Sequence, residues 1–356
     1  MEKELRLMKG NEAVAEAAIR AGADGYFGYP ITPQSEIMEY LMEANPQAKT
    51  GMVVLQAESE VAAINMVYGG AACGKKVMTT SSSPGISLKQ EGITYIAGAE
   101  LPCLIVNVVR GGPGLGTIQP AQSDYFQAVK GGGHGDYHLI VLAPASVQEM
   151  ADFVGLGFDL AFRYRNPVMI LSDGAIGQMM EKVWLSPPVE RSKTVPEWAT
   201  TGKPPSRQRN IITSLDLDPA AQERFNQKLI DKYNEIREKE VRYEEFQCGD
   251  AQYLLVAYGT SARICQKSVQ LARKEGLKVG LLRPITLFPF PSKQISGLAV
   301  KADLVISVEM SAGQMVEDVL LAVNGKTPVY HFGRMGGMVP TPEEVVEFLK
   351  SKITGD

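Results

Sequence analysis

Residues 1–185 alternate short apolar runs with longer amphipathic stretches, and no other feature constrains the fold as strongly. Six runs read as β-strands, at Gly25–Phe27, Met52–Leu55, Lys76–Thr79, Cys103–Val108, His138–Leu142 and Pro167–Leu171. Helical patterns fill the intervals, at Asn11–Ala21, Gln34–Glu43, Glu60–Ala72, Gln90–Gly98 and Val147–Arg163. This alternation predicts an α/β fold in which a parallel sheet carries helices on both faces. Ligands of such folds bind at the carboxyl ends of the strands.

The remaining sequence divides into a connector and a second, smaller unit. It is polar and rich in proline from Glu190 to Leu217, and Pro219–Phe246 is expected to form one long charged helix. A second α/β unit begins near Asp250, with strands at Tyr253–Tyr258, Lys278–Leu282, Leu304–Val308 and Val329–Phe332 and helices at Ala262–Lys274 and Gly313–Val323. We predict domains at 1–188 and 249–356, joined by a linker at 189–248.

Composition excludes several classes of function. The net charge of −4 offers no basic stripe for nucleic acid, and no apolar stretch approaches the ~20 residues that span a membrane. The amino terminus lacks a secretory signal, so we expect a cytoplasmic protein. The cysteines, Cys73, Cys103, Cys248 and Cys265, stand far apart without a CxxC pair. Any electron-carrying cluster is therefore expected on another chain.

Two loops after predicted strands contain candidate site residues. Gly28–Pro33 reads GYPITP, and its two prolines make it rigid enough to present the Thr32 hydroxyl and backbone N–H groups to a small anion. It could equally be a simple rigid turn. In Gln56–Glu60 two carboxylates stand at a helix start, where the helix dipole favours negative charge. The apolar helix that follows would alternatively bury one of them as a proton-shuttling acid.

Three further loops complete the set. Thr79–Gly85 is rich in hydroxyl groups and either lines a polar pocket or forms a capped turn. Arg110 follows a strand and precedes a glycine-rich loop, a position suited to two-pronged binding of a carboxylate. His134 and His138 are four residues apart, but the surrounding glycines disfavour the helix that a metal site with this spacing needs.

Taken in order, five segments resemble the alpha subunit of 2-oxoacid:ferredoxin oxidoreductases. They are GYPITPQSEI, QAESEVAAINMVYGGAACG, SSSPGISLKQEGI, VVRGGPGLGTIQPAQSDYFQA and GGGHGDYHLIVLAPASVQEM. The segment GTSARICQKSVQLARKEGLKVGLLRPITLFPFP resembles the transketolase-C-like domain of the same subunit. Details such as NEAVAEAAIRAG and RGGPGLG are most similar to the branched-chain, 2-ketoisovalerate subtype.

The resemblance implies a thiamine-diphosphate-binding fold whose pyrimidine-binding domain supplies a glutamate to the N1′ atom of the cofactor. In related domains a helix-ending glycine follows this acid by fourteen positions, an interval that Glu60 keeps to Gly74 and Glu58 does not. Glu60 is thus the expected catalytic residue, with Thr32 and Arg110 as ligands of the substrate carboxylate. The residues expected to contact the cofactor are Tyr29, Pro30, Ile31, Glu60 and Ser83.

The sequence lacks one motif of thiamine enzymes, and this bears on which subunits must assemble with the chain. The chain contains no GDG stretch followed by an Asn, the usual signature of the magnesium-diphosphate half of a thiamine site, and SDGAIGQ at Ser172 lacks the first glycine. The resemblance therefore implies that Mg²⁺ and iron–sulfur clusters belong to a diphosphate-binding beta-type subunit, a gamma-type subunit and a ferredoxin-like delta-type subunit. Coenzyme A is the implied co-substrate, and a homodimer is possible. The alternatives are a 2-oxoglutarate or pyruvate enzyme and a non-catalytic assembly subunit.

Overall fold

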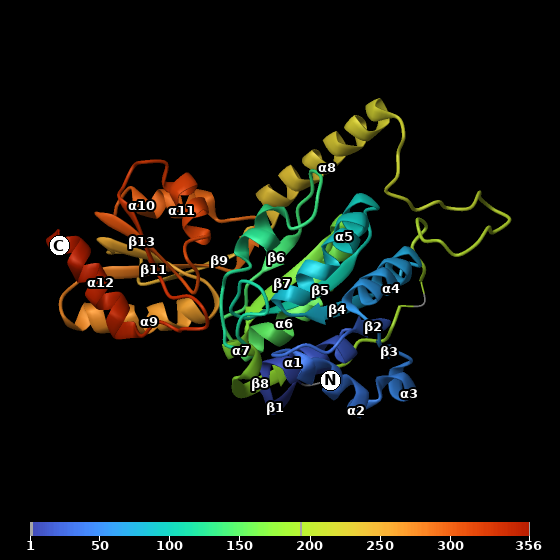
Figure 1. The fold of residues 1–356 in the computed structure, drawn as a ribbon, viewed down its shortest axis with the longest axis horizontal. Coiled ribbons are helices and arrows are strands. Elements are labelled where there is room, and N and C mark those ends of the chain that lie inside the picture. Colours follow the sequence, from blue (N-terminus) through green and yellow to red (C-terminus); the bar gives the residue numbers. More distant parts are fainter. Residues whose placement is uncertain (1–2, 193, 356) are drawn as a thin grey trace.

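The computed structural model describes residues 3–192 and 194–355, which form two α/β units (Figure 1). The larger unit is built on a seven-stranded sheet of order β12-β6-β7-β5-β4-β2-β3. Its strands are β2 (Gly25–Gly28), β3 (Val53–Gln56), β4 (Val77–Ser81), β5 (Cys103–Val109), β6 (Ile140–Leu142), β7 (Pro167–Asp173) and β12 (Thr286–Phe288). All neighbours pair in parallel except β12 and β6, which are antiparallel.

Helices cover both faces of this sheet. They are α1 (Gly10–Arg20), α2 (Ser35–Ala44), α3 (Pro46–Thr50), α4 (Glu60–Ala72), α5 (Ser83–Gly98), α6 (Val147–Tyr164) and α7 (Gly174–Gln178), with a short π-helix, η1, at Gln127–Gly131. Helix α1 packs against α6, and α4 packs against α5. The α/β fold class predicted from the sequence is confirmed.

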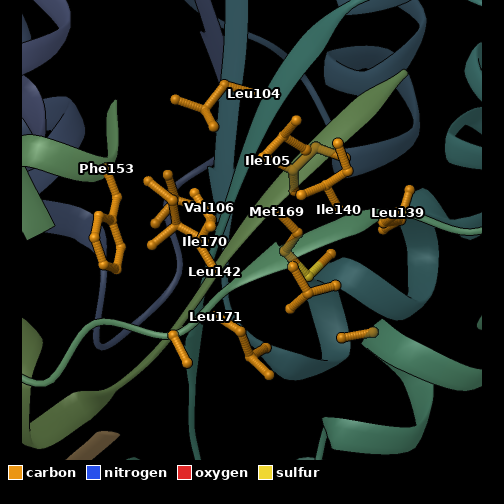
Figure 2. Packing of buried hydrophobic residues seen from close by; sticks show 14 of the residues in the cluster. Leu104, Ile105, Val106, Leu139, Ile140, Leu142, Phe153, Met169, Ile170 and Leu171 are labelled. Atoms are coloured by element: carbon orange, nitrogen blue, oxygen red, sulfur yellow. The ribbon is translucent and has the colours of Figure 1, made fainter. Parts of the chain in front are cut away.

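The core lies on the central strands. Every residue of β5 and β7 is buried, and their sequences CLIVNVV and PVMILSD are nearly continuous in apolar residues. A parallel strand covered by helices on both faces requires such a run, since neither face meets water. Figure 2 shows Ile105, Met169 and Ile170 packed among Leu142 and Phe153, which come from the neighbouring strand β6 and helix α6.

The connector departs from the predicted single helix. An antiparallel pair, β1 (Glu4–Lys9) with β8 (Met180–Leu185), closes the first unit. From 186 to 218, leaving out residue 193, the chain forms an extended loop without helix or strand. Helix α8 runs over Pro219–Lys239 and ends there, and Tyr243–Phe246 forms strand β9. The prediction of a helix to Phe246 was wrong because these last residues pair with β11.

The smaller unit has a five-stranded sheet of order β14-β13-β10-β11-β9. Its other strands are β10 (Tyr253–Val256), β11 (Val279–Pro284), β13 (Leu304–Glu309) and β14 (Val329–Gly333), all parallel to one another, whereas β9 is antiparallel. The helices are α9 (Gly259–Lys274), α10 (Ser292–Ala299), α11 (Met315–Val323) and α12 (Pro342–Thr354). The sequence patterns predict neither α10 nor α12. The exact domain limits remain a prediction.

Buried polar contacts join the two units. The Gln122 amide donates to Tyr258 O at 2.8 Å and accepts from Ser261 Oγ and Met310 N at 2.6 and 2.9 Å. Strand β12 also belongs by sequence to the second unit but completes the first sheet. Because these groups are buried and mutually satisfied, they fix how the second unit sits beside the carboxyl ends of β4 and β5.

Candidate active site

The candidate residues follow four neighbouring parallel strands. Strand β2 pairs with β3 on one side and with β4 on the other, so the connections leaving β2 and β4 diverge at this point. Such a switch in strand order leaves a crevice at the carboxyl edge, where ligands of open α/β sheets bind. The loops that contain Thr32, Glu60, Ser83 and Arg110 leave β2, β3, β4 and β5 at this edge.

The two glutamates differ sharply in environment. Ser59 caps α4 by accepting from Ala62 N at 3.2 Å, which makes Glu60 the first residue of the helix. Glu60 is only 7% exposed, whereas the Glu58 side chain lies at the surface and accepts from Ser59 Oγ at 2.9 Å. The Glu60 carboxylate makes no hydrogen bond or ion pair with any other described residue. A buried carboxylate without a partner can accept a hydrogen bond from a donor group of a ligand.

The wall beside Glu60 is formed by helix α5. A Cβ atom added to Gly85 would stand 2.8 Å from Glu60 Oε1, so only glycine accommodates the carboxylate at this distance. Helix α5 begins at Ser83, seven residues before the predicted start. The reason is that Pro84 stands in the first turn, where a missing N–H costs nothing, although Pro-Gly had read as a turn.

Arg110 joins three of the candidate loops. It is 8% exposed, and its Nη1 and Nη2 atoms donate to Thr32 O and Leu115 O, both at 3.0 Å. Its backbone N–H donates to Ser83 Oγ at 3.1 Å, and that hydroxyl in turn donates to Arg110 O at 3.2 Å. The Arg110 Nε–H is buried with no partner among the described residues. The guanidinium therefore keeps donors for an anion while holding the YPITP loop in place.

The Thr32 side chain is exposed, and buried hydrogen bonds hold the loop around it. Gln34 is fully buried and donates to Tyr29 O at 3.2 Å, and its amide oxygen accepts from Thr80 Oγ1. The Tyr26 hydroxyl lies 2.8 Å from the same Thr80 oxygen. This buried chain of hydrogen bonds fixes the backbone of Tyr29, Pro30 and Ile31, which the sequence had placed at the cofactor.

A buried lysine belongs to the same layer. Lys89 on α5 is fully buried, and its Nζ donates to Thr79 Oγ1 at 2.7 Å and to Thr80 O at 3.1 Å. Burial lowers the pKa of the Lys89 ammonium to about 7, against the opposing effect of the Glu60 charge. The sequence analysis does not single out Lys89, although a lone cation in the segment ISLKQEGITYIAG is a signal that could have found it.

A cleft of about 720 Å³ opens between the two units; Ser83 lines it, whereas Glu60, Thr32 and Arg110 do not. Its lining includes Ser83, Gly112 and Asp124 from the first unit and Ser311 and Gln314 from the second. Burial raises the pKa of the Asp124 carboxyl, although hydrogen bonds from Asn107 and Ser83 act in the opposite direction. Because part of the lining comes from the second unit, the sequence patterns predict neither this cleft nor the place of Asp124 in it.

Asp173, His134 and His138, the remaining polar groups that the sequence analysis considers, are engaged in contacts within the protein. Asp173 of the SDGAIGQ segment caps α7 through Ala175 N at 2.9 Å and accepts from Thr260 Oγ1 at 2.8 Å, which leaves it committed to the contact between the units. His138 stacks on Phe288 with ring centroids 4.2 Å apart, and His134 packs edge-on against Tyr95. Among residues 3–192 and 194–355, no three His, Cys, Asp or Glu side chains are grouped to hold a metal.

Comparison with known families agrees with this geometry. Residues 16–253 match the family described as pyruvate flavodoxin/ferredoxin oxidoreductase, thiamine diphosphate-binding, and residues 251–345 match core domain II of pyruvate:ferredoxin oxidoreductase. The chain belongs to this family. The resemblance inferred from the sequence motifs is thus confirmed. In the described part of the chain, no helix has the length and apolar character needed to cross a bilayer.

Relatives within the family match almost the whole chain. It is 51% identical to ketoisovalerate oxidoreductase subunit VorB of Methanothermobacter thermautotrophicus, over 99% of this chain and 98% of the relative. Identity to the VorB subunit of Methanothermobacter marburgensis is 54%, over 93% of each. Identity to 2-oxoglutarate synthase subunit KorA of Archaeoglobus fulgidus is 38%, over 98% and 100%.

Solved structures agree with the fold. The 2-oxoglutarate:ferredoxin oxidoreductase of Magnetococcus marinus, solved with 2-oxoglutarate, coenzyme A and succinyl-CoA, superposes with a TM-score of 0.86 at 29% identity. That match covers 99% of this chain and 66% of the solved one. A split-gene transketolase, in an inactive beta4 tetramer, has a TM-score of 0.61 at 13% identity over 98% of both chains, which is a likeness of fold alone.

Proposed function

We propose that this chain is the alpha subunit of a thiamine-diphosphate-dependent 2-oxoacid:ferredoxin oxidoreductase that acts on a branched-chain 2-oxoacid and contains half of the active site. The reaction yields an acyl-CoA and CO₂ and passes electrons to ferredoxin. The observation that carries the proposal is Glu60, a buried carboxylate without a partner, at the same sheet edge as Thr32 and Arg110. Thiamine diphosphate supplies the carbanion chemistry of such enzymes.

Glu60 would manage a proton at the N1′ atom of the pyrimidine ring. Its low exposure strengthens a hydrogen bond to that nitrogen, and the exclusion of a side chain at Gly85 leaves room for its carboxylate. The loop residues Tyr29, Pro30 and Ile31 would pack against the cofactor, and Gln34 holds this loop through its hydrogen bond to Tyr29 O. The Ser83 hydroxyl, which is bonded to Arg110, would complete the cofactor pocket.

Arg110 and Thr32 would hold the carboxylate of the 2-oxoacid. The guanidinium is always charged and has an unused Nε–H, and the Thr32 hydroxyl lies exposed on the loop that Arg110 contacts. A charged donor and a hydroxyl on adjoining loops form a set that suits a carboxylate.

The other half of the site would come from partner subunits. Asp173, the closest approach to a diphosphate motif, is bonded to Thr260 and α7, and no described cluster of acidic or sulfur ligands offers a place for Mg²⁺ or iron–sulfur clusters. Helix α4 is apolar apart from Glu60 and Asn65, and it exposes Val61 and Met66, at 45% and 38%. A helix of this kind needs cover. We infer that a diphosphate-binding beta-type subunit packs there and that gamma- and delta-type subunits complete the complex, with the iron–sulfur clusters on partner subunits.

The branched-chain preference is supported by the identity to the VorB subunits, 51% and 54%, against 38% to the KorA subunit. The experiment is an assay of the chain copurified with its natural partners. Reduction of ferredoxin, dependent on coenzyme A, is measured with 2-ketoisovalerate, 2-oxoglutarate and pyruvate in parallel. The proposal is supported if kcat/KM is highest for 2-ketoisovalerate. If kcat/KM is highest for 2-oxoglutarate or pyruvate, that acid is the substrate instead.

The assignment of Glu60 is tested in the same complex. Glu60→Gln retains size but loses the acid, so turnover should fall at least ~10²-fold. The control, Glu58→Gln, alters an exposed carboxylate on the preceding loop and should leave turnover near normal. Hydrogen–deuterium exchange at C2 of bound thiamine diphosphate reports the proton step directly. Normal exchange in Glu60→Gln excludes the proposed role, and normal turnover in both variants favours a non-catalytic assembly subunit.

A further inference from the structure

Loop 111–119, which directly follows Arg110, is closed at its base by backbone hydrogen bonds. Gly111 N donates to Gln119 O at 3.0 Å, and Thr117 N donates to Gly111 O at 2.8 Å. Residues 113–116 at the tip are exposed, and the Leu115 carbonyl accepts from Arg110 Nη2 at 3.0 Å. Since this carbonyl is one of the groups that hold the guanidinium, the place of the loop base decides where the guanidinium lies.

A turn of the second unit, Met335–Met338, follows strand β14. Its last residue donates its N–H to the carbonyl of its first residue at 3.3 Å, which closes the turn. The central residues, Gly336 and Gly337, have φ angles of +66° and +95°, which glycine adopts without the strain that other residues meet. Arg334, just before the turn, forms an ion pair with Glu344 of α12. The turn is therefore fixed to the body of the second unit.

The base of loop 111–119 packs directly against this turn. A Cβ atom added to Gly111 would stand 3.0 Å from both Gly336 C and Gly337 N. A Cβ atom added to Gly337 would stand 2.5 Å from Gln119 Cβ and 3.0 Å from Thr117 Cγ2. The backbones of the two units can approach this closely only because the facing residues are glycines.

We propose that Gly337 is a positioning residue for the 2-oxoacid site. By leaving space for the base of loop 111–119, it allows the second unit to hold this loop where Arg110 binds the substrate carboxylate. The inference rests on the proposed role of Arg110. The second unit then takes part in substrate binding, although Arg110 and Thr32 both belong to the first.

Gly337→Ala tests the contact by filling the space. Since a comfortable contact between carbon atoms is about 3.5 Å, the loop base and the turn must separate by about 1 Å. Gln119 Cβ is attached to the backbone and cannot turn aside as the end of a long side chain can, so the backbone itself must move. A displacement of this size should weaken the contact between guanidinium and carboxylate and raise KM for the 2-oxoacid about tenfold.

Gly276→Ala is the matched control. Gly276 lies in the same unit with a φ angle of +86°, and a Cβ atom there meets nothing within 4 Å. This variant shares the backbone strain of Gly337→Ala without the contact, so its KM should equal that of wild type. Both variants are measured in the assembled complex. C2 hydrogen–deuterium exchange of bound thiamine diphosphate, followed without 2-oxoacid, should proceed at the wild-type rate in both.

The inference is overturned if Gly337→Ala and Gly276→Ala have the same KM. It is also overturned if Gly337→Ala loses C2 exchange, because the damage would then extend beyond the substrate site. Should Gly337→Ala fail to assemble, Thr117→Ser decides instead. It removes the methyl group at Gly337, keeps the hydroxyl that accepts from Gln119 N at 3.3 Å, and should raise KM up to about fourfold, the equivalent of one buried methyl group. An unchanged KM in that variant overturns the inference.

Arg110→Ala, measured in parallel, separates this inference from the proposed function. An unchanged KM in Arg110→Ala refutes the proposed carboxylate site itself. A raised KM in Arg110→Ala together with a wild-type KM in Gly337→Ala refutes only the role of Gly337.

Discussion

Gly85→Ala tests whether the position of Glu60, and not merely its presence, matters for the reaction. The added Cβ would stand 2.8 Å from Glu60 Oε1 and would also overlap Ser81 Oγ. Since a comfortable contact is about 3.5 Å, the carboxylate must move by about 0.7 Å. Both overlapping atoms are ends of side chains that can turn aside, so the loss of stability should be small, about 1–2 kcal/mol.

The effect on catalysis should be larger, because a displacement near 1 Å can cost about 10²-fold in rate. Turnover of the assembled complex and C2 hydrogen–deuterium exchange are the readouts, with thermal unfolding measured alongside. Gly155→Ala on α6 is the matched control, because a Cβ there meets nothing within 4 Å and alanine favours the helix. If Gly85→Ala assembles and exchanges at the wild-type rate, the carboxylate does not act from the position described above.

Three further perturbations follow from the contacts. Arg110→Ala and Arg110→Lys should each raise KM for the 2-oxoacid about tenfold to a hundredfold in steady-state assays, because lysine lacks the planar donor geometry; unchanged KM values would remove Arg110 from the site. Gln122→Met leaves Ser261 Oγ and Met310 N without partners and removes one of the two hydrogen bonds to Tyr258 O, which keeps the bond from Ala262 N. The variant should cost about 2–4 kcal/mol in urea unfolding, against almost nothing for the exposed Gln208→Met; equal stability of the two variants would contradict a stabilising contact at Gln122 between the units. Burial would raise the pKa of Glu100, but ion pairs and hydrogen bonds with Lys228 and Lys232 outweigh it and hold this pKa below its ordinary value. The stabilisation from the Glu100 carboxylate is therefore present above pH ~4.3 and is lost as pH falls through the folded pKa. Glu100→Gln should be less stable than wild type at pH 7, and this difference in unfolding free energy should shrink in acid. The exposed Glu235→Gln is the control, for which little difference is expected at either pH.

The sequence by itself determined the fold class and the order of the site loops. Apolar runs such as CLIVNVV must be buried on both faces, and the helical stretches between them oblige the strands to run parallel. Parallel strands bring their carboxyl ends to one edge, so the loops with Thr32, Glu60 and Arg110 had to meet there. The family resemblance then singled out Glu60 from Glu58 by its interval to Gly74.

Tertiary structure decided what depends on contacts between distant segments. Tyr243–Phe246 reads as helix in isolation but becomes β9 because β11 offers an unpaired edge. Thr286–Phe288 joins the first sheet across a sequence distance that no local pattern encodes. Lys89 reads as one more polar residue on a helix until packing of α5 against α4 and β4 removes it from water. Burial depends on what covers a residue, and the covering segments lie far away in the chain, so the lowered pKa of Lys89 could not be predicted from spacing.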